Sequence, residues 1–188
     1  MSIFLCSDWH LLHDRDFVYA ARGFSSIEEM NETIIERHNS IVKPEDEVYV
    51  LGDCGLGGGS EEALQNLYNY MRQFNGKLHI VRGNHDTDTR AALYLTLPNV
   101  IDVQWAIVLN YKKYHFYLSH FPALCGNVDD KSLHKCTISL CGHSHVSDPF
   151  ADWDKGRIYH VEMDAHGCKP ISIDEILADI KQHLDNNH

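Results

Sequence analysis

The chain has 188 residues, a length that suits one domain with a substantial hydrophobic core, so we expect a single domain over residues 1–188. Its composition is ordinary for a globular protein, with 44% hydrophobic and 23% charged residues. The net charge of −11 argues against binding of long nucleic acid, which requires Lys and Arg to neutralise phosphates. Bound divalent cations would locally reverse the negative field, so this argument is weaker for an acidic metal site.

Three features predict a cytoplasmic protein without a membrane segment. No apolar run approaches the ~20 residues that span a bilayer. The N-terminus leads directly into a strand-like segment rather than into a signal peptide. The six cysteines form no CxxC pair and several lie in or beside apolar runs, which predicts reduced thiols rather than a zinc finger or a redox pair.

Strands and helices alternate in the first half of the chain. Runs rich in β-branched and aromatic residues predict strands, and apolar residues at helical spacing predict helices. In chain order, the predicted strands are 2–6, 47–51, 77–81, 103–109, 114–118, 137–141 and 157–163. The predicted helices are 25–42, 60–76 and 172–184. This order predicts an α/β protein with a layered sheet core and helices on the outside.

Serine residues mark the expected starts of the three helices. Ser26 is followed three residues later by Glu29, and Ser172 by Glu175, which is a capping-box spacing. Ser60 is a single expected cap. The predicted buried face of the first helix consists of Ile27, Met30, Ile34 and Ile41.

Potential metal ligands follow the carboxyl ends of five predicted strands. Because ligand sites in α/β sheets gather at that edge, these side chains are expected to meet. Turn chemistry explains Asp and Asn at such positions but does not explain repeated His. The total of 14 His against 16 Lys and Arg also favours metal binding. The candidate ligands are Asp8, His10, Asp53, Asn84, His120, His143 and His145.

The candidate ligands suit hard and borderline divalent ions. They combine carboxylate and amide oxygens with imidazoles and need no thiolate, which favours Mn, Fe, Zn or Ni over a structural zinc site. Seven ligands are too many for one ion and are about right for two. Two ions need a bridging group, and Asp53 is the predicted bridge because it stands alone at its strand end.

The same residues form five motifs that, in this order, resemble those of the calcineurin-like metallophosphoesterase family. The motifs are DWH at 8–10, GD at 52–53, GNHD at 83–86, SH at 119–120 and GHSH at 142–145. The stretch 28–53 is further similar to the small bacterial and phage phosphoesterases of this family. The resemblance implies a single metallophosphoesterase domain with two packed β-sheets flanked by helices, in a four-layer α/β/β/α sandwich.

The resemblance also implies a role for each ligand. Asp8, His10 and His145 would bind one metal ion, and a second set would bind the other, with Asp53 bridging. His85 would be the catalytic imidazole that protonates the leaving group, and Asp86 is a candidate to orient it. The second set consists of Asn84, His120 and His143.

The implied activity is hydrolysis of small phosphate mono- or diesters, nucleotides among them, by attack of a metal-bridging hydroxide. His13 and Arg82 are candidate substrate contacts, while the roles of Asp14 and His166 stay open. Two other readings remain: a non-catalytic interaction scaffold on the same fold, and a nuclease of the same family. The sequence does not fix the substrate, the native metals or the oligomeric state.

Two departures from the family pattern bear on these expectations. Leu12 stands where many relatives have Gly, which puts the backbone of that loop in doubt. The stretch 52–60 reads GDCGLGGGS and lacks the GDxxDRG element of the family's protein Ser/Thr phosphatases, which argues against that activity. Its GLGGGS part lacks the Lys-Ser/Thr ending of a P-loop, so we interpret it as a flexible connection.

Overall fold

The computed structural model of this chain describes residues 1–126 and 132–186. The strands are β1 (Ile3–Cys6), β2 (Glu47–Leu51), β3 (Lys77–Val81), β4 (Val100–Gln104), β5 (Ala106–Tyr111), β6 (Tyr114–Ser119), β7 (Thr137–Cys141), β8 (Ile158–His160) and β9 (Ile171–Ser172). The helices are α1 (Asp16–Tyr19), η1 (Ala20–Arg22), α2 (Ile27–Ile41), α3 (Glu61–Met71), α4 (Asp88–Tyr94), α5 (Trp153–Gly156) and α6 (Ile173–Asn186).

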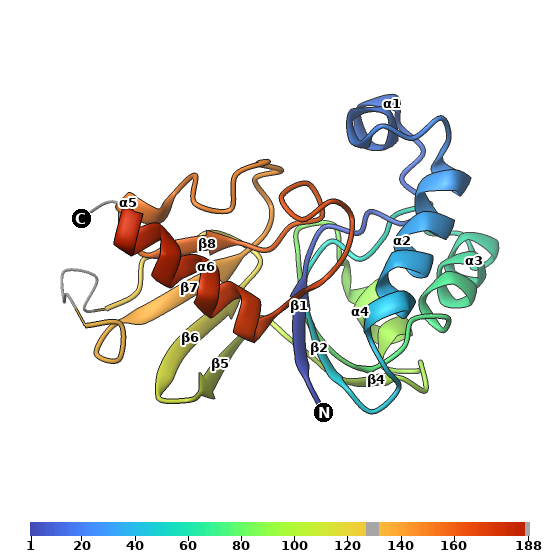
Figure 1. The fold of residues 1–188 in the computed structure, drawn as a ribbon. Helices are drawn as coiled ribbons and strands as arrows, with labels where there is room; N and C mark the ends of the chain where they lie inside the picture. The colour runs from blue at the N-terminus through green and yellow to red at the C-terminus, as the bar shows by residue number, and fades with distance from the viewer. Residues whose placement is uncertain (127–131, 187–188) are drawn as a thin grey trace.

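The strands form two mixed sheets (Figure 1). The first has the order β4-β3-β2-β1-β9, in which β1 to β4 are parallel and β9 is antiparallel. The second has the order β5-β6-β7-β8, in which only β5 is antiparallel to its neighbour. The carboxyl ends of β1, β2 and β3 therefore share one edge of the first sheet, and those of β6 and β7 share one edge of the second.

Alternation along the strands divides the core into two hydrophobic clusters. In β1, Phe4 and Cys6 pack in a cluster with Met30 and Ile34 of α2. Leu5 points to the opposite face and packs in a second cluster with residues of β6, β7 and α6. Since side chains of a strand alternate between faces, one strand serves both clusters. The predicted class, two mixed sheets flanked by helices, is confirmed.

The expected helix caps are present. The hydroxyl of Ser26 accepts a hydrogen bond from the backbone of Glu29 at 3.2 Å, and the Ser60 hydroxyl caps α3 in the same way. The capping box expected at Ser26 is not reciprocal, because the Glu29 carboxylate accepts hydrogen bonds from the backbone and hydroxyl of Ser25 instead. Ser172 and Glu175 form a complete reciprocal capping box. None of the helices in the described part of the chain is both long and apolar enough to cross a membrane.

Several details of the fold differ from the sequence predictions. The predicted strand 103–109 is broken at Trp105, where the chain leaves the first sheet as β4 and enters the second as β5. A continuous apolar run cannot show such a change of sheet, because both halves are strand. Ile41 is 40% exposed because it is the last residue of α2, beyond the packed face. The strand expected over 157–163 is the shorter β8, and the helix expected over 60–76 ends at Met71 as α3. The helices α1, α4 and α5 and the strand β9 were not predicted.

Candidate metal centre

Loops from both sheets meet at the carboxyl ends of five strands. Backbone hydrogen bonds join the loop after β1 to the loop after β2: the Asp8 N–H donates to the Gly52 carbonyl at 2.9 Å, and the His10 N–H donates to the Asp53 carbonyl at 3.0 Å. In the second sheet, the loops after β6 and β7 are joined by a bond from the Gly142 N–H to the His120 carbonyl. The predicted ligands are held in place by these loop-to-loop bonds.

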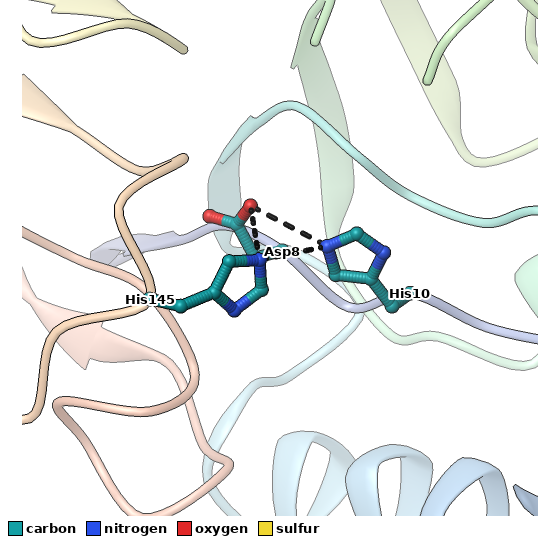
Figure 2. Close-up of side chains that lie close together, drawn as sticks. All are labelled: Asp8, His10 and His145. Carbon is teal, nitrogen blue, oxygen red and sulfur yellow. Dashed lines mark hydrogen bonds and ion pairs between the residues drawn. The ribbon is translucent and has the colours of Figure 1, made fainter. Parts of the chain in front are cut away.

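The first group of ligands consists of Asp8, His10 and His145 (Figure 2). The two Nε2 atoms lie 3.1 Å apart, and each lies 3.7 Å from Asp8 Oδ1. That oxygen is buried and has no hydrogen-bond partner among the described residues. A buried carboxylate oxygen without a partner is costly, and a cation bound between it and the two rings would satisfy it. The group therefore fits a divalent metal ion.

The other oxygen of Asp8 is fully engaged. Asp8 Oδ2 accepts hydrogen bonds from the Ser7 hydroxyl at 2.6 Å and from the backbone N–H of His143 at 3.0 Å. Burial alone would raise the pKa of Asp8, but the nearby imidazoles of His10, His120 and His145 and the bond from Ser7 hold it below its ordinary value. The carboxylate is consequently kept ionised, as a metal ligand must be.

The second group of ligands surrounds His120. Its Nδ1 donates to the Leu51 carbonyl at 2.9 Å, and because a carbonyl only accepts, the neutral ring presents its lone pair at Nε2. That Nε2 lies 2.9 Å from Asn84 Oδ1, 3.2 Å from His143 Nδ1 and 3.5 Å from Asp53 Oδ2. Several electron-rich atoms thus converge on one point, which is the arrangement expected around a second cation.

Asp53 lies between the two groups. Its Oδ2 is 3.8 Å from His10 Nε2 and 3.5 Å from His120 Nε2. Two of the clusters able to hold a metal ion contain Asp53, one with His10 and His85 and the other with Asp8 and His120. Its position is suitable for a carboxylate shared by two ions, and the bridging role stays a prediction.

Asp86 does not orient the His85 ring, contrary to what we considered from the sequence. Its carboxylate accepts hydrogen bonds from the backbone N–H groups of Asp53, Cys54 and Gly83, at 2.7, 3.2 and 2.8 Å. It also accepts one from the Tyr94 hydroxyl on α4 at 2.8 Å. Burial raises the pKa of Asp86, and these donors oppose that shift. Asp86 therefore fixes the loop that carries Asp53.

His85 and His13 lie beside the first group. His85 Nε2 is 3.9 Å from Asp53 Oδ2, and its side chain is 38% exposed, so a substrate can reach it. The His85 backbone is held by Asp53 Oδ1, which accepts its N–H at 2.9 Å. His13 Nδ1 is 3.1 Å from His10 Nδ1, and the His13 and His85 ring centres are 5.8 Å apart. Burial and the nearby imidazoles lower the pKa of His13 to about 4.

The remaining candidates lie farther from the ligand groups. The Arg82 guanidinium donates to the Asp86 carbonyl, pairs with Asp88 at 2.8 Å and stacks on Trp105 at 4.3 Å. A phosphate contact from Arg82 would compete with these contacts and stays a prediction. His166 donates to the His160 carbonyl and lines a separate groove of about 600 Å³ beside β9. Asp14 is exposed.

Sequence reasoning missed two residues that contact the site. Asp164 Oδ2 accepts from His145 Nδ1 at 2.9 Å, and Arg22 pairs with Asp164. Asp164 raises the pKa of His145 through this hydrogen bond, with burial opposing the shift. Neither residue lies in a metal-ligand motif. The only signal in the sequence was the polar stretch DAH at 164–166, of which we had singled out only His166.

The sequence of this chain matches a known protein family over most of its length. Residues 1–161 match the model of the calcineurin-like phosphoesterase superfamily domain. The chain belongs to this superfamily. The uncharacterized protein MJ1445 of Methanocaldococcus jannaschii is 30% identical over 186 residues, which is 96% of this chain and 92% of that protein. The resemblance drawn from the five motifs is therefore confirmed.

A solved structure shares the fold of this chain over most of its length. AQ665 of Aquifex aeolicus, a protein of unknown function, superposes with a TM-score of 0.66 at 22% identity, covering 93% of this chain and 97% of its own. YfcE, a phosphoesterase from E. coli, is more distant, with a TM-score of 0.45 at 18% identity and coverage of 86% and 78%. The similarity to AQ665 supports the fold, while the superfamily is shown by the family match.

Proposed function

We propose that this chain is a dinuclear metal-dependent phosphoesterase that hydrolyses small phosphate mono- or diesters. The observation that carries the proposal is the position of Asp53 between the two ligand groups, together with the buried Asp8 Oδ1, which has no hydrogen-bond partner among the described residues. Asp8, His10 and His145 would hold one ion. The ligands of the other would be Asn84, His120 and His143.

In the proposed mechanism, His85 donates a proton to the leaving group. When bound, two divalent ions lower the pKa of a water molecule and neutralise charge on the phosphate oxygens. His85 is partly exposed, and its backbone is held on both sides, by Asp53 Oδ1 and by the Arg90 guanidinium, which donates to its carbonyl. The His85 imidazole, placed by this fixed backbone, is suited to donate a proton to the leaving oxygen, a contribution of roughly 10²–10⁴-fold in rate.

Two exposed aromatic rings beside the ligands favour an ester with an aromatic group, such as a nucleotide. Phe17 on α1 is 72% exposed, and its ring centre lies 5.7 Å from that of His13. Phe121 is 49% exposed, and its ring centre lies 4.7 Å from that of His143. Exposed aromatic rings at the rim of a polar site are suited to stack on a base or aryl group.

The donor set and the cysteines support the remaining parts of the proposal. Imidazole, carboxylate and amide ligands suit Mn, Fe, Zn or Ni, and metal-binding measurements distinguish among these metals. All six cysteines are free thiols, five of them buried, which supports a reducing, cytoplasmic location.

The proposal is tested by metal binding and hydrolysis of a bis-aryl phosphate diester with added Mn or Ni. We expect about two ions per chain and metal-dependent hydrolysis. The Asp53→Asn variant should lose both metal binding and hydrolysis. The His85→Gln variant should keep the ions, but its kcat should fall by roughly 10²–10⁴-fold. Asp174→Asn is the control, since Asp174 pairs with Lys112 on the surface. Wild-type chain that binds two ions yet hydrolyses no ester in a broad panel would contradict the proposal.

A further inference from the structure

A buried ion pair lies directly behind the first ligand group. The Arg22 guanidinium binds Asp164 through two parallel bonds, Nε to Oδ1 at 3.0 Å and Nη2 to Oδ2 at 2.8 Å. The Arg22 side chain is only 2% exposed, and that of Asp164 is 18% exposed. A two-bond pair of this kind fixes both planes relative to each other, unlike a single-bonded surface pair. The orientation of the Asp164 carboxylate is thus set by Arg22.

Asp164 in turn contacts a ligand. His145 Nδ1 lies 2.9 Å from Asp164 Oδ2. Since an ionised carboxylate only accepts, the Nδ1 of His145 carries the hydrogen, and the neutral ring leaves its lone pair on Nε2. That Nε2 is the atom that faces His10 Nε2 and Asp8 Oδ1 (Figure 2). The carboxylate therefore selects the tautomer that can bind a metal ion.

Arg22 also holds the loop that carries Asp8. The same guanidinium donates to the Asp8 carbonyl at 2.8 Å and to the Trp9 carbonyl at 3.3 Å. Asp8 has a left-handed backbone, with a φ of 58°, which a non-glycine residue adopts only when its surroundings hold it. The Arg22 guanidinium thus contacts the loop after β1 directly, and it is linked to the loop after β7 through Asp164. These two loops belong to different sheets.

We propose that Arg22 and Asp164 are positioning residues for the first metal ion. Asp164 fixes the tautomer and orientation of His145, and Arg22 fixes both Asp164 and the backbone of Asp8. The inference rests on the proposed function, because it requires an ion bound by Asp8, His10 and His145. Partners behind metal-binding imidazoles commonly account for 10–100-fold in metal affinity.

A purely structural ion pair predicts something different. It would join η1 to the loop after β8, and its loss would lower the melting temperature without changing the affinity of one metal site relative to the other. The positioning role instead predicts weaker binding at one site and unchanged binding at the second, whose ligands Asn84, His120 and His143 do not contact Arg22 or Asp164 in the described residues.

The test is Mn²⁺ binding to the full chain by titration calorimetry, with folding checked by circular dichroism. We expect Asp164→Ala to weaken one of two sites by about 10–100-fold. Asp164→Asn should lose less, because an amide oxygen still accepts from His145 Nδ1. Arg22→Lys should also lose less than Arg22→Met. Asp179→Asn is the matched control, since its carboxylate accepts from the Tyr159 hydroxyl away from the ligands.

A second readout requires no metal. In metal-free protein labelled with ¹⁵N on histidine, long-range proton–nitrogen spectra report the tautomer of His145, which we expect to change from Nδ1–H in the wild type to a mixture in Asp164→Ala. Unchanged affinity at both sites in a folded Asp164 variant would overturn this inference alone. A wild-type chain that binds no Mn²⁺ would overturn the proposed function as well.

Discussion

Left-handed backbone is concentrated around the metal centre. Residues without the freedom of glycine adopt this conformation at a cost of about 1–3 kcal/mol each when the surrounding structure holds them. In this chain, the left-handed conformation turns the backbone of the loops so that the side chains of the candidate ligands point toward one another. The residues of these loops with positive φ, between 49° and 74°, are Asp8, His10, Leu12, Asp53, His143 and His145.

Leu12 stands at a position where glycine is favoured. Its φ is 61°, in the left-handed region of the backbone. The larger side chain is accommodated in this conformation and packs in part against the cluster between the first sheet and its helices. The motif glycines are more constrained. A Cβ on Gly83 would collide with the Asp53 carboxylate, and one on Gly142 would collide with the Asp8 carboxylate.

At this scale, Phe17 provides a test of the aromatic substrate. Phe17→Ala should raise KM for an aryl or nucleotide ester by about tenfold, because stacking contributes about 1–3 kcal/mol per base. KM for an aliphatic ester should be unchanged, and the metal content should stay the same. Steady-state kinetics on both esters gives the comparison. Leu95→Ala is the control for losing an exposed apolar side chain. An equal rise for both esters would contradict stacking.

Among the elements, α2 connects the polar loops to the core. Its packed face contains Met30 and Ile34, and the same helix buries His38 against Trp9 and Phe74. Trp9 stacks on Phe74 at 4.0 Å and is fully buried, so the residue between Asp8 and His10 packs in the core. The loop after β1, which carries Asp8 and His10, is therefore held by the packing of Trp9 against Phe74 and α2.

His38 makes the stability of this layer depend on pH. Burial lowers its pKa to about 4, although Nε2 lies 2.9 Å from the Asn75 carbonyl, and Nδ1 has no partner in the described part of the chain. Between pH ~6.5 and ~4, the unfolded chain binds a proton that the folded chain does not. The free energy of unfolding should therefore fall as pH falls through this window, by up to about 3 kcal/mol.

Urea unfolding of metal-free protein at several pH values measures this slope. His38→Gln retains a donor for the Asn75 carbonyl and removes the titrating group, so its stability should fall less between pH ~6.5 and ~4 than that of the wild type. His115→Gln, at an exposed position of β6, should keep the wild-type slope. If the free energy of unfolding of the wild type and of His38→Gln falls equally with pH, His38 does not cause the pH dependence of stability.

Across the whole molecule, the candidate ligands come from both sheets, which apolar contacts and the Arg22–Asp164 pair also hold together. Asp8, His10 and Asp53 follow strands of the first sheet, while His120 and His145 follow strands of the second. Helix α6 adds Ile176 and Ile180 to the cluster between the sheets. We propose on this basis that residues 1–188 form one domain. A bound ion in each group would connect the sheets at the edge where the apolar cluster ends.

Metal binding should therefore stabilise the entire fold. At free Mn²⁺ about 100-fold above Kd, linkage contributes about 2.7 kcal/mol for each site. For one site this corresponds to a rise of about 5–10 °C in Tm in a chain of this length. Differential scanning calorimetry with Mn²⁺ or with a chelator measures the shift, and one cooperative transition is expected for one domain. Asp53→Asn should shift much less. A Tm that does not respond to Mn²⁺ would contradict this.

The sequence by itself determined the superfamily, the class of fold and the set of candidate ligands. It could do so because strand periodicity is local and because every candidate ligand follows the end of a strand within a few residues, as Asp53 follows β2 and His120 follows β6. The caps Ser26, Ser60 and Ser172 were equally predictable, since a cap acts within one helical turn.

Only the tertiary structure decided which residues stand behind the ligands. Arg22 and Asp164 are separated by 142 positions, and Asp86 contacts Asp53 across 33, so no periodic pattern relates them. The change of sheet at Trp105 and the contact of Arg22 with the Asp8 carbonyl likewise depend on the tertiary structure. Local chemistry marks a ligand, whereas its orientation depends on neighbours that the fold brings from distant segments.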